Sequence, residues 1–207
     1  RDFSVLVTSA ARIYAAGAHF GSTYDGAQGA MTTAFTLVSS APASVVAVSA
    51  GEEHVAFLDS QGRVWVWGRN AEGQCGVDPS SARSFASPVR LSALDGKEIT
   101  AVAAGGWHTL ALARDGSVWC FGKNSDGQCG AEGRRVIAPP VRISPELFGG
   151  MSAVSVAAGQ SHSFVATSKV RLRPARDPFE LFLWFGLDCG RFLAFGKLRF
   201  CPARFHI

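Results

Sequence analysis

The chain has 207 residues, of which 47% are hydrophobic, 17% are charged and 23 are glycine, and this composition excludes a disordered polypeptide. The net charge of +4 arises in residues 169–207, because residues 1–168 hold 12 basic and 13 acidic side chains and give no electrostatic case for binding nucleic acid. The most apolar stretch, residues 179–196, contains Glu180, Asp188 and Arg191, which excludes a membrane span.

Cysteine usage favours a reducing compartment. The number of cysteines is odd, and none belongs to a C-x-x-C pair or to a Cys/His spacing typical of a zinc site. We therefore expect reduced thiols and a cytoplasmic or nuclear location. The chain begins with Arg1 rather than methionine, without a signal peptide, and we expect this end to be a cut end. The cysteines are Cys75, Cys120, Cys129, Cys189 and Cys201.

An internal repeat of 54 residues organises the chain. Residues 50–76 read AGEEHVAFLDSQGRVWVWGRNAEGQCG, and residues 104–130 read AGGWHTLALARDGSVWCFGKNSDGQCG. A glycine and a histidine at the start of this segment recur a third time at the same spacing. A fixed period of this length indicates a repeat architecture in which each copy is one supersecondary unit.

Incomplete copies flank the two complete ones. Upstream, RIYAAG at residues 12–17 aligns with RVWVWG at residues 63–68, and the copy then decays. The sequence therefore predicts a partial, degenerate repeat over 1–44, complete repeats over 45–98 and 99–152, the start of a further repeat over 153–167, and a divergent basic and aromatic tail over 168–207.

The tail allows two interpretations. Residues 188–197 resemble the hairpin of the repeat with one residue missing, so the tail is either a degenerate repeat or disordered. The remaining residues of the tail show no clear periodicity.

Each complete repeat predicts four antiparallel strands. In the first, an apolar run, a turn at residues 59–62 and a β-branched and aromatic run form a hairpin. One strand precedes the hairpin and another follows a loop, which makes a propeller blade. We expect an all-β fold, a β-propeller of four-stranded antiparallel blades, here a partial ring of about three to four blades. The expected strands are 45–50, 55–58, 64–67 and 88–91, then 99–104, 109–113, 118–121 and 140–143, then 153–158.

The repeat resembles that of the regulator of chromosome condensation family. The motifs are A-A-G-G-W-H-T at residues 103–109, D-G-S-V-W-C-F-G at 115–122 and G-Q-C-G at 127–130, and the resemblance is specific over residues 45–167. It implies a ring of about seven blades, of which this chain supplies three or four. WD repeats are excluded, because they are shorter and carry a Trp-Asp signature.

The resemblance implies a non-enzymatic protein-interaction propeller. The family's best-known role is guanine-nucleotide exchange on a small GTPase such as Ran, which needs no nucleophile or cofactor. One alternative is an accessory, partner-recruiting domain of a larger protein such as a HECT-type ubiquitin ligase; a less favoured one is UV-B photoreception. We expect a protein partner, no direct nucleic-acid or membrane binding, no metal and no catalytic residue. The oligomeric state stays open.

The repeated histidines and glycines are predicted to be structural. A residue that occupies the same place in every blade points in a different direction around a ring, so the copies cannot converge on one reaction centre. Buried polar groups are usually hydrogen-bonded, and we expect each histidine to tie the backbone of its blade through its ring nitrogens. We expect the glycines to end strands or to allow positive φ in turns. These structural residues are Gly51, His54, Gly68, Gly76, Gly105, His108, Gly122, Gly130, Gly159 and His162.

Partner binding is expected on the loops, whose sequences differ between the copies. Loops at residues 69–87 and 123–139 carry arginines, which are enriched in binding hot spots. Among the tryptophans, Trp107 alone is a candidate surface aromatic, whereas Trp65, Trp67 and Trp119 are expected to fill the core. Cys75 and Cys129 are expected to be small buried hydrophobes without a disulfide. The partner-binding candidates are Arg83, Trp107, Arg134 and Arg135.

Overall fold

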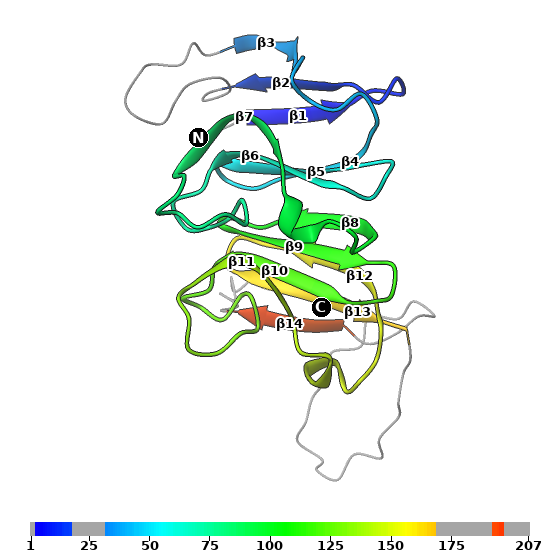
Figure 1. Cartoon of the computed structure of the whole chain (residues 1–207), viewed down its shortest axis with the longest axis vertical. Helices are drawn as coiled ribbons and strands as arrows, with labels where there is room; N and C mark the ends of the chain where they lie inside the picture. Colours follow the sequence, from blue (N-terminus) through cyan, green and yellow to red (C-terminus); the bar gives the residue numbers. More distant parts are fainter. Residues whose placement is uncertain (1–2, 18–31, 169–191, 197–207) are drawn as a thin grey trace, which may run out of the picture.

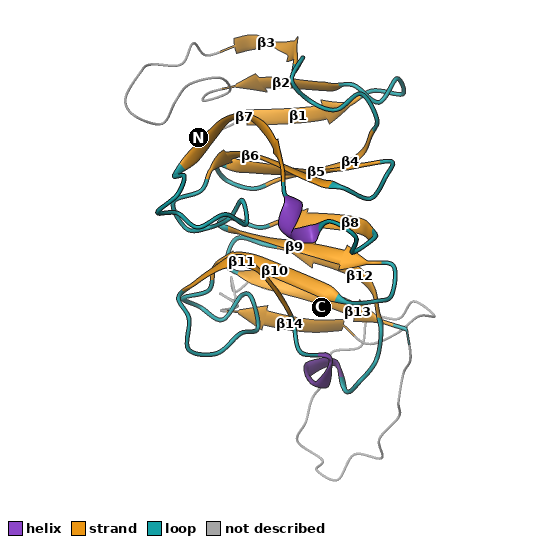
Figure 2. Ribbon diagram, viewed as in Figure 1, coloured by secondary structure: helices purple, strands orange, loops and turns teal. Residues whose placement is uncertain are grey.

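Four antiparallel sheets form the described part of the chain. The computed structural model describes residues 3–17, 32–168 and 192–196, and over these residues every regular element is a strand except for two short 3-10 helices. Successive sheets lie one beyond the other along the long axis of the molecule (Figure 1). Figure 2 shows the strands, the loops and the short helices η1 and η2 of the described residues. The expected all-β class is confirmed.

Two sheets have four strands and two have three. Within each sheet the strands follow chain order. The first sheet comprises β1 (Phe3–Val7), β2 (Ile13–Gly17) and β3 (Thr32–Leu37). The second comprises β4 (Val45–Ala50), β5 (His54–Asp59), β6 (Val64–Arg69) and β7 (Ser84–Arg90). The third comprises β8 (Ile99–Ala104), β9 (His108–Ala113), β10 (Val118–Lys123) and β11 (Val136–Arg142), and the fourth β12 (Ala153–Ala158), β13 (His162–Thr167) and β14 (Phe192–Gly196). The helices are η1 (Ser92–Leu94) and η2 (Pro145–Phe148).

Each pair of neighbouring sheets encloses its own apolar core. Alternate side chains of a strand point to opposite faces. In β6, Val64 and Val66 therefore face the third sheet, whereas Trp65 and Trp67 face the first. The same alternation in β10 directs Trp119 toward the second sheet. Because both faces of the middle sheets are covered, each sheet depends on its neighbours for burial.

The fourth strands begin earlier than expected. β7 starts at Ser84 and β11 at Val136, whereas the sequence predicted strands at residues 88–91 and 140–143. The predicted strands started late because each was taken to begin at a proline, Pro88 or Pro140. Proline lacks a backbone N–H but is tolerated in edge strands, and both strands lie at the edge of their sheet. The loops are correspondingly shorter, at residues 70–83 and 124–135.

Residues 192–196 in the predicted tail form the third strand of the fourth sheet. β14 pairs with β13 so that His162 faces Gly196. The same register joins His54 to Gly68 and His108 to Gly122. This part of the tail thus takes the place of a repeat strand. The remainder of the predicted hairpin at 188–197 lies outside the described residues.

Among the residues that the structure describes, no helix has the length and apolar character needed to span a membrane.

Candidate partner-binding surface

The repeated histidines join neighbouring sheets. His54 Nε2 lies 2.8 Å from the hydroxyl oxygen of Thr109, and that hydroxyl donates to the backbone carbonyl of Gln74 at 2.9 Å. A hydroxyl has one proton, so Thr109 must accept from His54, which fixes the hydrogen on Nε2. One sheet onward, His108 Nε2 lies 2.9 Å from the hydroxyl of Ser163, which donates to the carbonyl of Gln128 at 2.7 Å. Each ring thus reaches a backbone carbonyl of its own repeat through a hydroxyl of the following sheet.

Burial keeps these rings neutral. The pKa is lowered to about 3 in His54 and to about 4 in His108; desolvation is the main cause and the charge of the next histidine along the series the second, while the backbone of that histidine acts in the opposite direction. Both side chains are essentially inaccessible, and their Nδ1 atoms have no hydrogen-bond partner among the described residues. Neither ring can reach a substrate. A structural role for His54 and His108 stays a prediction, with which this burial is compatible.

Glycine is required where each ring packs against the preceding turn. A Cβ atom on Gly105 would overlap with the ring of His108 and would lie 2.6 Å from the carbonyl oxygen of Gly159. Gly51 meets the ring of His54 in the same way, and Gly159 meets that of His162. The matching glycines of the third strands and of the G-Q-C-G loops instead have positive φ, at 104° for Gly68, 74° for Gly76, 111° for Gly122 and 61° for Gly130.

Buried amides hold the two long loops in shape. The side chain of Asn70 donates to the carbonyls of Val77 and Ala82, and its oxygen accepts from the N–H of Cys75. Asn124 makes the matching three bonds in the next repeat. These bonds fix a rigid base from which the variable loop residues project.

The sulfur atoms of Cys120 and Cys129 form a disulfide, with Cα atoms 5.4 Å apart. The expectation of reduced thiols is wrong for this pair. Cys75 stays free and buried, and burial raises the pKa of its thiol. The two repeats differ at the position of Cys120: the residue 54 positions earlier is Val66, which cannot form a disulfide with Cys75.

A cluster of three side chains lies at the end of the sheets where β4 turns into β5. Arg69 Nη1 bonds to Glu53 Oε2 at 2.8 Å, and the guanidinium lies 5.2 Å from the ring centroid of Trp107. Glu53 and Arg69 belong to the repeat at 45–98, which we call the second, and Trp107 belongs to the repeat at 99–152, the third. The ion pair is half-buried, with side-chain exposures of 30% for Arg69 and 9% for Glu53. The cluster combines an aromatic ring with a preoriented guanidinium, which is the chemistry of binding hot spots.

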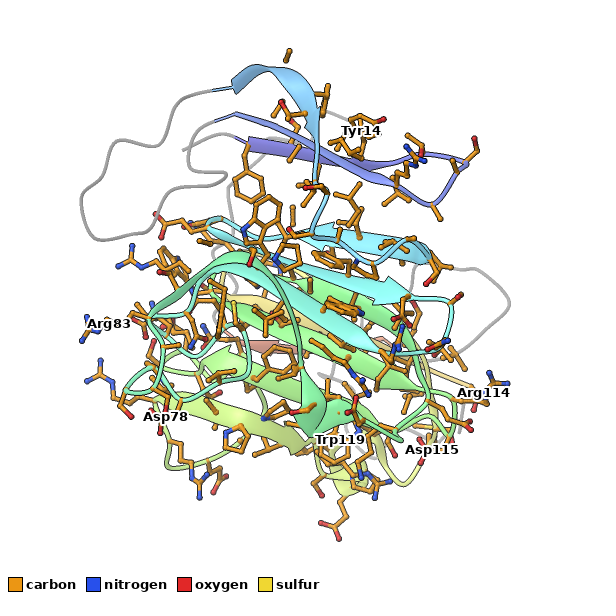
Figure 3. The ribbon with its side chains drawn as sticks, turned by 45° about the horizontal axis from the view of Figure 1, so that its top comes forward. Tyr14, Asp78, Arg83, Arg114, Asp115 and Trp119 are labelled. Atoms are coloured by element: carbon orange, nitrogen blue, oxygen red, sulfur yellow. A yellow bond between two sulfur atoms is a disulfide. The ribbon has the colours of Figure 1, made fainter. Side chains whose placement is uncertain are left out.

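The predicted arginines are exposed at the same end. Arg83 ends the loop after β6, and Arg134 and Arg135 end the loop after β10. Figure 3 shows Arg83 on the opposite side of the molecule from Arg114. Over the described residues no ion pair or hydrogen bond joins the side chains of these three arginines to Trp107. The structure thus places all four candidates at one end, and brings only Trp107 into a cluster.

Glu53 and Arg69 were not among the residues predicted from the sequence to bind a partner. Neither stands out in its own repeat, because their contact with Trp107 crosses between repeats. The available signal was the mismatch between copies, since Glu53 aligns with Trp107 and then with Ser161.

We call the end formed by the β4–β5, β6–β7, β8–β9 and β10–β11 connections the cluster end, and the end with the β5–β6 and β9–β10 turns the hairpin end.

The four tryptophans that the structure describes do not gather on one face. Trp67 is buried, as predicted. Trp65 and Trp119 lie next to the turns at the hairpin end and are only partly buried, so the expectation that they fill the core is incomplete. Each has a cation above its ring, from Arg63 at 6.0 Å and from Lys97 at 5.1 Å.

Comparison with known proteins identifies the repeat. The model of the regulator of chromosome condensation (RCC1) repeat matches residues 61–112 and 115–166, which is half of the chain. A second model of the same repeat matches residues 45–74 and 99–128.

Similar proteins differ in what they do. The human probable E3 ubiquitin-protein ligase HERC6 is 38% identical over 120 residues, covering 56% of this chain and 11% of HERC6. The ultraviolet-B receptor UVR8 of Arabidopsis thaliana is 34% identical over 131 residues, covering 63% of this chain and 29% of UVR8. The crystal structure of Prp20p from Saccharomyces cerevisiae, described with its binding to Gsp1p and histones, superimposes with a TM-score of 0.72 at 20% identity over 83% of this chain and 43% of Prp20p. The chain thus spans less than half of each of these proteins.

Proposed function

The chain belongs to the RCC1 repeat family, and from this premise we propose that it binds a protein partner through its cluster end, the first candidate being a Ran-like small GTPase whose nucleotide exchange it promotes. The carrying observation is the Glu53–Arg69–Trp107 cluster, which occurs at the junction of two repeats and is flanked by the exposed Arg83, Arg134 and Arg135. Binding at a rigid scaffold end with variable loops is how such folds acquire specificity.

Exchange would require binding and no covalent step. A protein that binds the nucleotide-free GTPase more tightly than the loaded form shifts the equilibrium toward nucleotide release. The cluster supplies what such binding needs, a half-buried arginine held in place by Glu53 and an aromatic surface on Trp107. The similarity to Prp20p supports the propeller fold; the activity rests on the proposal.

The test measures release of fluorescent GDP from a Ran-like GTPase with and without the full chain. We expect faster release with the chain and a marked loss in Trp107→Ala, because truncation of an aromatic hot spot costs about 2 kcal/mol, roughly thirtyfold in affinity. Arg12→Ala is the control, since Arg12 is exposed in the β1–β2 turn at the other end. Unchanged release rates, together with no binding to the nucleotide-free GTPase, would refute exchange.

A second candidate is recruitment of partners within a ubiquitin ligase, which the 38% identity to HERC6 favours. This function uses the same cluster end without nucleotide release. The sequence that adjoins the chain in its gene distinguishes the two, because a ligase function requires a catalytic domain there. UV-B sensing is less favoured, because Trp107 lies at the cluster end while Trp65 and Trp119 lie at the hairpin end. Sedimentation that does not change under ultraviolet light would eliminate it.

A further inference from the structure

A pocket of about 370 Å³ opens at the hairpin end, between the third sheet and the connection that leads into it from β7. Its walls come from the connection before β8 and from the β9–β10 turn, and the ring of Trp119 and the side chain of Arg142 complete it. Figure 3 shows Arg114, Asp115 and Trp119 near one another in this region. The pocket therefore lies far from the cluster end and is independent of the function proposed there.

The equivalent place in the preceding repeat is filled by a carboxylate. The side chain of Asp59 is fully buried and accepts from Trp65 Nε1 at 2.9 Å and from Arg63 Nε at 2.6 Å. It also accepts from the backbone N–H groups of Gln61 and Arg63. The indole N–H and the guanidinium beside the ring are thus satisfied within the chain.

The third repeat keeps the ring and loses the carboxylate. At an offset of 54 residues, Trp119 repeats Trp65, but Ala113 replaces Asp59 and Ser117 replaces Arg63. These smaller side chains leave the space that forms the pocket. Among the described residues, Trp119 Nε1 has no hydrogen-bond acceptor, and the cation above its ring is now Lys97, at 5.1 Å.

The charges that line the pocket leave cations in excess. Glu98 pairs with Arg114 at 3.2 Å, and Asp115 accepts from the N–H and the hydroxyl of Ser117. Arg142 interacts with Asp115 only as a more distant charge. Within the part of the chain that the structure describes, neither Lys97 nor Arg142 belongs to an ion pair. The unsatisfied groups are therefore an indole N–H, an ammonium and a guanidinium, all of which are donors.

We propose that this pocket binds an aspartate or glutamate side chain from an acidic linear segment of a protein partner. The guest carboxylate takes the place that Asp59 occupies in the preceding repeat, accepts a hydrogen bond from Trp119 Nε1 and pairs with Lys97 and Arg142. We expect a carboxylate because the Asp59 carboxylate of the preceding repeat accepts hydrogen bonds from the indole N–H and from a cation at once.

The direct test titrates the full chain with a fluorescein-labelled peptide containing three central glutamates, followed by fluorescence anisotropy. Two matched peptides carry glutamine or phosphoserine at the same positions. We expect the glutamate peptide to bind at least tenfold more tightly than the glutamine peptide, with weaker binding as salt is raised. Equal binding of the glutamate and glutamine peptides overturns the proposal, as does binding of the phosphoserine peptide alone.

Variants locate the binding. Ala113→Asp restores within the chain the carboxylate of the preceding repeat, and we expect it to lower peptide affinity at least tenfold. Trp119→Phe keeps the ring but removes the indole N–H, with about a tenfold loss expected. Lys97→Ala should lose about fivefold. Arg12→Ala, which removes an exposed cation from the first sheet, should bind as the wild type does.

Circular dichroism checks that each variant is folded. If Ala113→Asp does not fold, Lys97→Ala and Trp119→Phe decide the matter, because neither side chain is fully buried. A loss of affinity in Arg12→Ala equal to that in Lys97→Ala would show general attraction to positive charge and would overturn the pocket as the binding site.

Discussion

Acidification should unfold this protein through its inter-sheet histidines. Above pH 6.5 a histidine is mostly neutral in the unfolded chain, and the folded chain holds His54 and His108 neutral as well. Below pH 6.5 the unfolded chain takes up protons that the folded chain refuses, because the pKa is lowered to about 3 in His54 and about 4 in His108. A lowered folded-state pKa means that stability is present at neutral pH and is lost as the pH falls.

The size of the loss follows from the difference between the two pKa values. A pH of 5 lies about 1.5 units below the ordinary pKa of histidine. Protonation of each of these histidines in the unfolded chain therefore lowers the free energy of unfolding by about 2 kcal/mol. The two together should remove about 4 kcal/mol between pH 7.5 and pH 5, a large share of the stability of an ordinary domain. Structurally, a proton on either Nδ1 would place a charge on a ring that is essentially inaccessible to water.

Urea denaturation followed by circular dichroism, at half-unit steps from pH 7.5 to pH 4.5, measures this slope. The key variant is His108→Gln, whose amide can still donate to Ser163 but cannot take up a proton. It should be less stable than the wild type at pH 7.5, yet lose only about 2 kcal/mol by pH 5. Equal losses in the variant and the wild type would refute the assignment of the slope to His108.

Four further substitutions, one of them a control, test the contacts between and within the sheets. Gly105→Ala should lower the free energy of unfolding by about 3 kcal/mol in urea, because its Cβ would overlap with a buried ring, whereas Gly127→Ala, which has open space around it, should cost only about 1 kcal/mol through its positive φ. Thr109→Val removes the hydroxyl between two buried groups and should cost about 2 kcal/mol in the same assay. Asp59→Asn should cost about 2 kcal/mol, because it replaces the buried carboxylate that accepts charge-assisted hydrogen bonds with a neutral amide; an unchanged thermal midpoint would contradict this.

The period in the sequence predicted the inner framework well. The strands expected at 45–50, 99–104 and 153–158 are β4, β8 and β12. These strands and the hairpins that follow them depend on local alternation and on turns, both of which can be read along the chain. The starts of β7 and β11 were not predicted, because proline was interpreted as a boundary where an edge strand tolerates it.

The side-chain contacts between repeats were the part that sequence could not supply. Aligning the copies pairs Cys75 with Cys129 and thereby hides Cys120, the residue that bonds to Cys129. In the same way, aligning Glu53 with Trp107 conceals that both contact Arg69. A repeat comparison shows which residues are equivalent, whereas these contacts join residues that are not.

Positions that are identical between the repeats should therefore stabilise the fold, whereas positions that differ between the repeats should determine partner binding. Residues shared by the copies, such as His54 and His108, face equivalent surroundings in each sheet, so a partner that binds once cannot depend on one of them alone. A single binding site must use positions where the copies differ, as Trp107 differs from Glu53 and Ala113 from Asp59. Substitutions at exposed unequal positions should change partner affinity while leaving the urea midpoint unchanged, and substitutions at shared buried positions should lower the midpoint first. Affinity losses that follow the midpoint at both kinds of position would mean that the repeat has no separate binding surface.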